Sequence, residues 1–156
     1  MDNNDILRRV RYMLDLSDSK MIKLFGLADY TASRAEVSDW LKKDDDPAYQ
    51  KLSDNLLAIF LNGLIVDKRG KREGDQLVPE EELTNNIVFK KLKIAFDMKA
   101  DDIIEVFSSV DVTISAHELS AFMRNPKQSQ YRLCNDQYLR NFINGLQLKY
   151  RKSEEA

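Results

Sequence analysis

The sequence has little of what builds catalytic and metal centres, with one Cys and one His among its 156 residues. The lone Cys134 cannot form an internal disulfide, and the lone His117 cannot supply a multi-histidine metal site. A phosphate-binding Walker loop, a dinucleotide fingerprint and a nucleophile elbow are all absent. We therefore expect a protein that is not an enzyme and has no cofactor or metal.

Long hydrophobic runs and an excess of one charge are also missing. The longest apolar run is the six residues from Leu56 to Leu61, whereas a membrane span needs about 20. The chain opens with the polar and acidic stretch MDNND, where a leader peptide would be basic and then apolar. We expect a cytoplasmic protein without a membrane contact. The net charge of −2 means that binding of a polyanion would depend on local basic patches.

What is present is the composition of a folded protein, with 43% hydrophobic and 32% charged residues. The sequence also contains an internal repeat. Shifting the chain by 82 positions aligns residues 3–70 with 85–152 without a gap, and 18 of the 68 pairs are identical. Residues 71–84, with Gly74 and Pro79, read as a linker. The simplest architecture is two tandem repeats related by an approximate twofold, and a single intertwined domain is the alternative.

Apolar residues at helical spacing predict four helices in each repeat and no strand, so the fold class is all-α with about eight helices. Asn4 is the candidate N-cap of the first helix, and Ser17 or Asp18 begins the second. The third helix begins with a capping box in both repeats, Ser33 with Glu36 and Ser115 with Glu118.

The fourth helix is expected over residues 54–67 and 136–150, and it contains Gly63 and Gly145. A glycine inside a helix costs about 1 kcal/mol relative to alanine. Its recurrence therefore indicates close helix packing, which we favour, or a bend.

Several polar residues have structural explanations. Cys134 aligns with Leu52, which predicts a buried thiol, and His117 aligns with Ala35 near a helix start, which predicts a surface position. The acidic runs 44–46 and 80–82 do not match a calcium loop and read as solvated segments. Aspartates that recur at helix ends are typical of caps and turns; they are the pairs Asp15/Asp97 and Asp29/Asp111.

The second helix, a turn of about four residues and the capped third helix have the dimensions of a helix-turn-helix. The start of the reading helix would carry Ser33, Arg34, Val37 and Ser38 in one repeat and Ser115, Ala116, His117 and Ser120 in the other. Only Arg34 has the forked donors that suit guanine. A compact helical bundle with short turns is the alternative.

Clusters of basic residues recur at matching places in the two repeats, and together with Arg34, which has no basic counterpart, they are the candidate contacts to nucleic acid. The candidates are Arg8, Arg9, Arg11, Arg34, Lys68, Arg69, Lys90, Lys91, Lys93, Lys149 and Arg151, with Lys152 beside the last of them. Solvated helix faces whose cations pair with nearby carboxylates explain the same residues.

Three stretches of the chain, NNDILRRVRYMLDLSD, AEVSDWLKK and FLNGLIVDKRGKREG, resemble the bacterial YehS-like family. This is a family of unknown function whose domain occurs as a tandem pair, and the resemblance covers nearly the whole chain. It implies a cytoplasmic bacterial protein. It implies no activity and no site residues.

We therefore expect a binding or regulatory module with a macromolecular partner, with nucleic acid as the more testable candidate. The alternative is a protein-binding or structural module, which could associate with itself. Exposure of Trp40, Tyr49 or Tyr131 would support that alternative, because aromatic anchors concentrate at interfaces. The sequence leaves the oligomeric state open.

Overall fold

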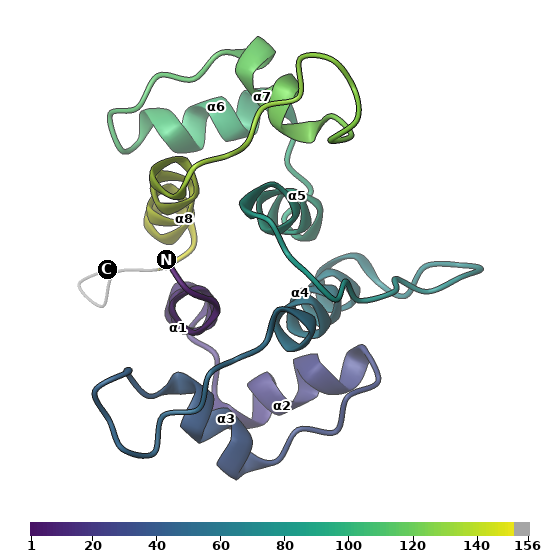
Figure 1. Ribbon diagram of the computed structural model, residues 1–156, viewed down its shortest axis with the longest axis vertical. Coiled ribbons are helices and arrows are strands. Elements are labelled where there is room, and N and C mark those ends of the chain that lie inside the picture. Colours follow the sequence, from purple (N-terminus) through teal and green to yellow (C-terminus); the bar gives the residue numbers. More distant parts are fainter. Residues whose placement is uncertain (152–156) are drawn as a thin grey trace. The chain divides into compact units, whose positions relative to one another are not determined.

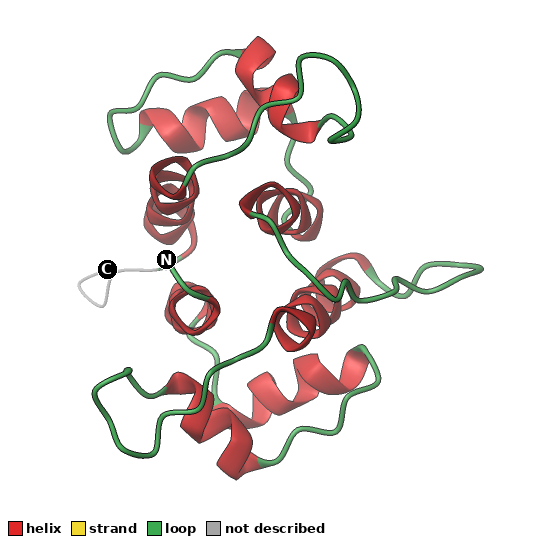
Figure 2. Cartoon of the chain, in the orientation of Figure 1, coloured by secondary structure: helices red, strands yellow, loops and turns green. Residues whose placement is uncertain are grey.

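The computed structural model describes residues 1–151, and these residues form eight α-helices and no strand (Figure 2). The prediction of an all-α tandem-repeat fold is confirmed. The chain divides into two compact units, unit 1 from Met1 to Leu83 and unit 2 from Thr84 to Ala156. Unit 1 contains α1 (Asn3–Leu14), α2 (Asp18–Leu27), α3 (Arg34–Leu41) and α4 (Asp54–Arg69). Unit 2 contains α5 (Asn85–Ala95), α6 (Ala100–Ser108), α7 (Ala116–Met123) and α8 (Asp136–Tyr150).

The two units repeat one arrangement of helices. Figure 1 shows the first and fourth helix of each unit end-on, with the second and third lying across them. The most extensive packing joins α2 to α4 in unit 1 and α6 to α8 in unit 2. Within residues 1–151, no helix has both the length and the apolar character needed to cross a membrane.

Aromatic rings lie at the centre of each unit. In unit 1, Phe25 is fully buried, with its ring centroid 5.2 Å from that of Phe60 and 5.3 Å from that of Trp40. In unit 2, Phe89 stacks on Phe142 at 4.2 Å. Burial of such side chains stabilises a fold by about 1.5–3 kcal/mol each. Trp40 is only 5% exposed, so it belongs to the core and does not support an aromatic interface.

The predicted capping boxes of α3 and α7 are present. Ser33 accepts from the Glu36 amide at 3.0 Å, and Ser115 accepts from the Glu118 amide at 3.1 Å. A tyrosine hydroxyl also donates to each glutamate, from Tyr30 to Glu36 and from Tyr138 to Glu118. These tyrosines are not aligned in the repeat. The two units thus reach the same capped start of the third helix with different partners.

The prediction that Asn4 caps α1 is wrong, because Asp2 is the N-cap and Asn4 lies inside the helix. Asn4 is fully buried. Its amide donates to the carbonyls of Trp40 at 3.0 Å and Gln50 at 2.8 Å, and its oxygen accepts from the Leu52 amide at 2.9 Å. Buried polar groups need such partners. Asn4 therefore ties α1 to the segment between α3 and α4.

The same bonds recur in unit 2. Asn86 donates to the carbonyls of Phe122 at 3.0 Å and Arg132 at 2.8 Å, and it accepts from the Cys134 amide at 2.9 Å. The preceding asparagines bind the start of the fourth helix, with Asn3 to Asp54 and Asn85 to Asp136 both at 2.7 Å. The repeated Asn-Asn pair is therefore a structural connection that holds each unit together.

The glycines of the fourth helices mark close helix packing, as favoured from the sequence. A Cβ on Gly63 would lie 1.8 Å from the Leu24 carbonyl oxygen, and one on Gly145 would lie 2.5 Å from that of Val106. Leu24 and Val106 are aligned residues of α2 and α6. The absence of a side chain lets the backbones of two helices touch at this point in each unit.

The recurring aspartates take the left-handed conformation that ends a helix. Asp15 and Asp97 both have φ of 52°, and Asp29 and Asp111 have φ of 66° and 61°. Asp tolerates this region better than most residues. Their left-handed turns account for the recurrence of these aspartates in both repeats.

Most of the predicted linker, residues 71–84, belongs to unit 1. The Asn55 side chain donates to the Glu80 carbonyl at 3.1 Å, and the Leu83 amide donates to the Asp54 carboxylate at 2.9 Å. The segment up to Leu83 therefore returns to the start of α4. Thr84 is the N-cap of α5.

Candidate nucleic-acid interface

The predicted phosphate contacts are distributed over both units. They lie on α1, at the start of α3, at the end of α4, on α5 and at the end of α8. Lys152 lies outside the described residues. The charge of the two units differs, since residues 1–83 contain 13 basic and 17 acidic side chains and residues 84–156 contain 11 and 9. Unit 2 therefore has a net charge of +2 and is the better candidate for binding a polyanion.

On α1, the half-buried Arg8 is held by its own unit. Its guanidinium forms an ion pair with Asp5 and donates to the Lys42 carbonyl at 2.8 Å. Partial burial disfavours ionisation of Asp5, but the Asp2 amide and the Arg8 charge outweigh it and lower the Asp5 pKa. Arg9 is half-buried and Arg11 is exposed. Of these three cations, Arg11 presents the most side chain to a ligand.

On α5, the aligned cations differ in exposure. Lys90 is exposed, Lys93 is half-buried and Lys91 is only 7% exposed. Lys90 and Lys93 are three residues apart and so lie on one side of the helix. Neither has an ion-pair partner among residues 1–151. This pair presents two cations that no carboxylate of the described chain neutralises.

The helix pairs α2–α3 and α6–α7 have longer connections than predicted. Residues 28–33 join the first pair and residues 109–115 the second, where a helix-turn-helix has a turn of three or four residues. At the start of α3, Arg34 lies 3.6 Å from the Asp18 carboxylate. The exposed residues at the start of α7 include Ala116, His117 and Ser120, none of which has a forked donor.

At the end of α4, Lys68 and Arg69 are exposed in the last turn, where cations stabilise a helix end. The corresponding part of α8 ends with the exposed Lys149 and the half-buried Arg151, the C-cap residue. These positions suit a structural role at the helix end as well as a contact to phosphate.

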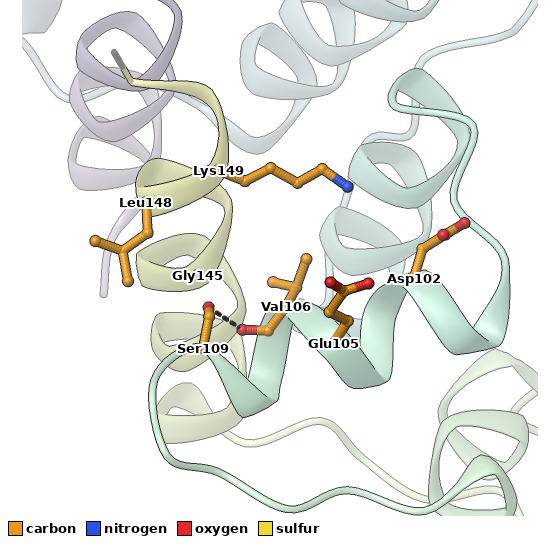
Figure 3. Close-up of a pocket in the computed structure, with 7 residues that line it drawn as sticks. All are labelled: Asp102, Glu105, Val106, Ser109, Gly145, Leu148 and Lys149. Carbon is orange, nitrogen blue, oxygen red and sulfur yellow. Dashed lines mark hydrogen bonds between the residues drawn. The ribbon is translucent and has the colours of Figure 1, made fainter. Parts of the chain in front are cut away.

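Lys149 also lines a cavity of about 230 Å³ between α6 and α8. Figure 3 shows Asp102 and Glu105 on α6 and Lys149 on α8 around this cavity. The Ser109 hydroxyl donates to the Val106 carbonyl at 2.6 Å. In unit 1, Lys20 aligns with Asp102 and Asp67 aligns with Lys149. Lys20 and Asp67 form an ion pair at 2.7 Å. The positions of the two charges are thus exchanged between the units. The nearby carboxylates make Lys149 a weaker candidate for binding phosphate.

Neither Cys134 nor His117 lines the cavity between α6 and α8. Cys134 is buried, and burial raises the pKa of its thiol to about 12, which makes it a poor nucleophile. His117 is exposed on α7. Within residues 1–151, no group of three or more His, Cys, Asp or Glu side chains could hold a metal ion. The acidic run 44–46 and the residues Glu81 and Glu82 are exposed, and Glu80 is half-buried.

Unit 2 has a second cavity, of about 310 Å³, and its lining residue Arg124 is not among the cations predicted from the sequence. Lys90 lines the same cavity. The signal was in the repeat alignment: Arg124 aligns with Lys42, whereas Ala121 stands where unit 1 has Asp39. Unit 2 therefore keeps a cation at this position and lacks the nearby carboxylate of unit 1.

Comparison with known proteins gives the same division of the chain into repeats but no activity. The family profile described as "Protein of unknown function (DUF1456)" matches residues 3–70 and 85–152. The chain is 42% identical over 147 residues to the "Uncharacterized protein YehS" of Escherichia coli (strain K12), which covers 94% of each chain. No solved structure matches. The resemblance in the repeated stretches is thereby confirmed, and the chain belongs to the DUF1456 family of unknown function.

Proposed function

We propose that this protein is a non-enzymatic binding module that contacts nucleic-acid phosphates, with α5 of unit 2 as the main contact. The observation that carries the proposal is the pair Lys90 and Lys93, which share one side of α5 and have no ion-pair partner among residues 1–151. The net charge of +2 on unit 2 supports it. Cations of this kind bind the backbone without regard to sequence.

The chemistry of the third helices supports phosphate contact over base reading. Arg34 has a carboxylate neighbour in Asp18, and α7 begins with Ala116 and His117. A base reader requires donors and acceptors that match base edges in the groove. We therefore expect similar affinity for unrelated sequences, with Arg11, Lys68 and Arg69 of unit 1 as secondary contacts.

Fluorescence anisotropy with labelled duplex DNA, single-stranded DNA and RNA tests the proposal. Binding should weaken steeply between about 50 and 200 mM salt, because cations that bind phosphates release counterions. Lys93→Gln should reduce the affinity and lower the slope of log K against log salt by about one. Arg11→Gln, at the aligned position, should have a smaller effect because unit 1 has a net charge of −4.

The matched control is Lys23→Gln, which removes an exposed lysine of α2 outside the predicted clusters. Its affinity and salt slope should equal those of the unaltered protein. Absence of binding to all three nucleic acids at low salt would overturn the proposal. Equal losses of affinity in the Lys93→Gln and Lys23→Gln variants would show that α5 is not the contact.

A protein partner is the second candidate, and one observation favours it. Tyr12 and Ile94 occupy the same position in the two repeats, and they are 48% and 38% exposed. Aromatic side chains such as that of Tyr12 are enriched at protein interfaces. Sedimentation velocity of the unaltered protein and of Tyr12→Ser with Ile94→Ser tests self-association, which the double variant should abolish. A monomer at all concentrations would leave only a heterologous partner for this candidate.

A further inference from the structure

The second cavity of unit 2 lies between the first turns of α5 and the segment that follows α7. Its volume is about 310 Å³, and its lining includes Ile87 and Lys90 of α5 with Phe122, Arg124, Pro126 and Tyr131. This volume is at the lower end of the range for small-molecule sites. Apolar and ring side chains form much of the wall, and two cations supply the charge. We call it the α5–α7 cavity.

Neither of the two cations has a counterion in the described part of the chain. No carboxylate of residues 1–151 lines the cavity, and neither Lys90 nor Arg124 forms an ion pair within that part of the chain. The Arg124 Nε is buried and has no hydrogen-bond partner in the described chain. A buried donor without a partner is costly. Binding of an external hydrogen-bond acceptor at Arg124 therefore removes this free-energy cost.

Unit 1 shows what the same cations do when they are neutralised internally. Arg8, aligned with Lys90, pairs with Asp5 and donates to the Lys42 carbonyl. Lys42, aligned with Arg124, pairs with Asp39 at 3.1 Å. Each of these two cations of unit 1 thus pairs with a carboxylate three residues before it in the sequence.

Unit 2 keeps the cations and lacks both carboxylates. Ile87 stands where unit 1 has Asp5, and Ala121 stands where it has Asp39. Thr84 and Pro126 also replace aspartates, Asp2 and Asp44. The internal anions of unit 1 are therefore absent from the cavity of unit 2, and its charge is suited to an anion from outside the chain.

The tyrosine of the cavity differs in the same way. In unit 1 the Tyr49 hydroxyl donates to Asn4 Oδ1 at 3.1 Å. The aligned Tyr131 lines the cavity, and its hydroxyl has no hydrogen-bond partner within residues 1–151. It is half-buried, so part of its side chain is accessible to a ligand in the cavity.

We propose that the α5–α7 cavity binds a phosphate monoester attached to a planar ring, as in a nucleoside monophosphate or the 5′-terminal nucleotide of a strand. Two unpaired cations match a phosphate monoester, which has a charge of about −1.5 to −2 at neutral pH, better than a single carboxylate. The ring packs against the apolar wall beside Tyr131. This inference does not rest on binding to the nucleic-acid backbone, because a free nucleotide suffices.

Isothermal titration of the full chain with AMP, adenosine and inorganic phosphate tests the site. AMP should bind with a dissociation constant below about 1 mM, and adenosine and phosphate should each bind at least about tenfold more weakly. Arg124→Gln and Lys90→Gln should each weaken AMP binding about tenfold or more, and Arg124→Lys should retain part of it. Circular dichroism and thermal unfolding establish that each variant is folded.

Unit 1 supplies two matched tests. Lys42→Gln, at the position aligned with Arg124, should leave AMP binding unchanged. Ile87→Asp restores the carboxylate of unit 1 in unit 2, and it should abolish AMP binding in a folded protein because the carboxylate pairs with Lys90. If the Arg124→Gln, Lys90→Gln and Ile87→Asp variants all bind AMP as tightly as the unaltered protein does, the proposal is overturned.

Two labelled oligonucleotides, with a 5′-phosphate or a 5′-hydroxyl, distinguish the sources of the monoester. At least about tenfold tighter binding of the phosphorylated strand, lost in Arg124→Gln, identifies a strand end. AMP binding without this difference identifies a free nucleotide. Failure of both AMP and the phosphorylated strand overturns the site, whereas backbone binding that depends on Lys93 would still support the proposed function.

Discussion

Gly63 of α4 packs against the backbone of Leu24 in α2, at a distance that leaves no room for a side chain, since a Cβ would lie 1.8 Å from the Leu24 carbonyl oxygen. Unit 2 has the same relationship between Gly145 and Val106, at 2.5 Å. The two glycines lie where α4 packs on α2 and α8 packs on α6, which are the most extensive helix contacts of the two units.

Gly63→Ala should therefore destabilise the protein by about 3 kcal/mol, because a backbone atom must move to admit the methyl group. The control is Gly26→Ala in α2, where nothing lies within 4 Å of an added Cβ. That change should stabilise by up to about 1 kcal/mol through helix propensity. Urea unfolding measures both. Equal effects of the two substitutions would contradict the close packing.

Asn86→Ala should destabilise by at least about 3 kcal/mol, because it leaves two carbonyls and the Cys134 amide without their partner. Asn4→Ala should cost more, since Asn4 also accepts from Tyr49. Asn55→Ala, which removes a hydrogen bond to the Glu80 carbonyl at a half-buried site, is the control and should cost about 1 kcal/mol. Chemical denaturation of the three variants tests this order.

The Cys134 thiol should not react with iodoacetamide in the folded protein at neutral pH. It is 3% exposed, and its pKa is raised to about 12 by burial, so the reactive thiolate is scarce. Mass spectrometry should find the alkylated product only after addition of denaturant. Rapid labelling of the native protein would mean that the segment before α8 opens readily.

The pKa of Asp54 is lowered, first by the Asn3 side-chain hydrogen bond and then by the Leu83 amide. A carboxyl with a lowered pKa adds stability above its unfolded pKa of about 3.9, and that stability is lost as the pH falls through its folded value. Asp54→Asn should thus be less stable than the unaltered protein at pH 7, by about 1 kcal/mol, and the gap should close in acid.

Unfolding at about pH 7, 4 and 2.5 measures this gap across the titration of Asp54. Asp45→Asn, in the exposed loop after α3, is the control and should match the unaltered protein at pH 7. A gap for Asp54→Asn that stays constant down to the lowest pH would show that ionisation is not the source of its stability.

The helices and the repeat could be predicted because their signals are local or internal to the chain. Capping boxes at Ser33 and Ser115 act over three residues, and apolar spacing reports the buried face of one helix. The role of Asn4 could not be predicted in this way. Its partners Trp40 and Gln50 are 36 and 46 residues away, so its place inside the helix was mistaken for a cap.

The candidate interface shows the same limit. The sequence grouped Arg8, Lys90 and Lys91 as equivalent cations, although Arg8 is bound to its own unit, Lys90 is exposed and Lys91 is 7% exposed. Arg124 was absent from that group, because a single arginine between helices has no pattern of its own. Its importance depends on which carboxylates are near it in space.

The sequence by itself determined the all-α class, the two repeats and the helix starts at the capping boxes, because periodicity, short-range capping and internal identity are all readable along one chain. Only the tertiary structure decided which polar residues are used inside each unit and which cations lack a counterion within residues 1–151. That difference depends on contacts between residues far apart in sequence, such as Arg8 with Lys42 and Asn86 with Phe122.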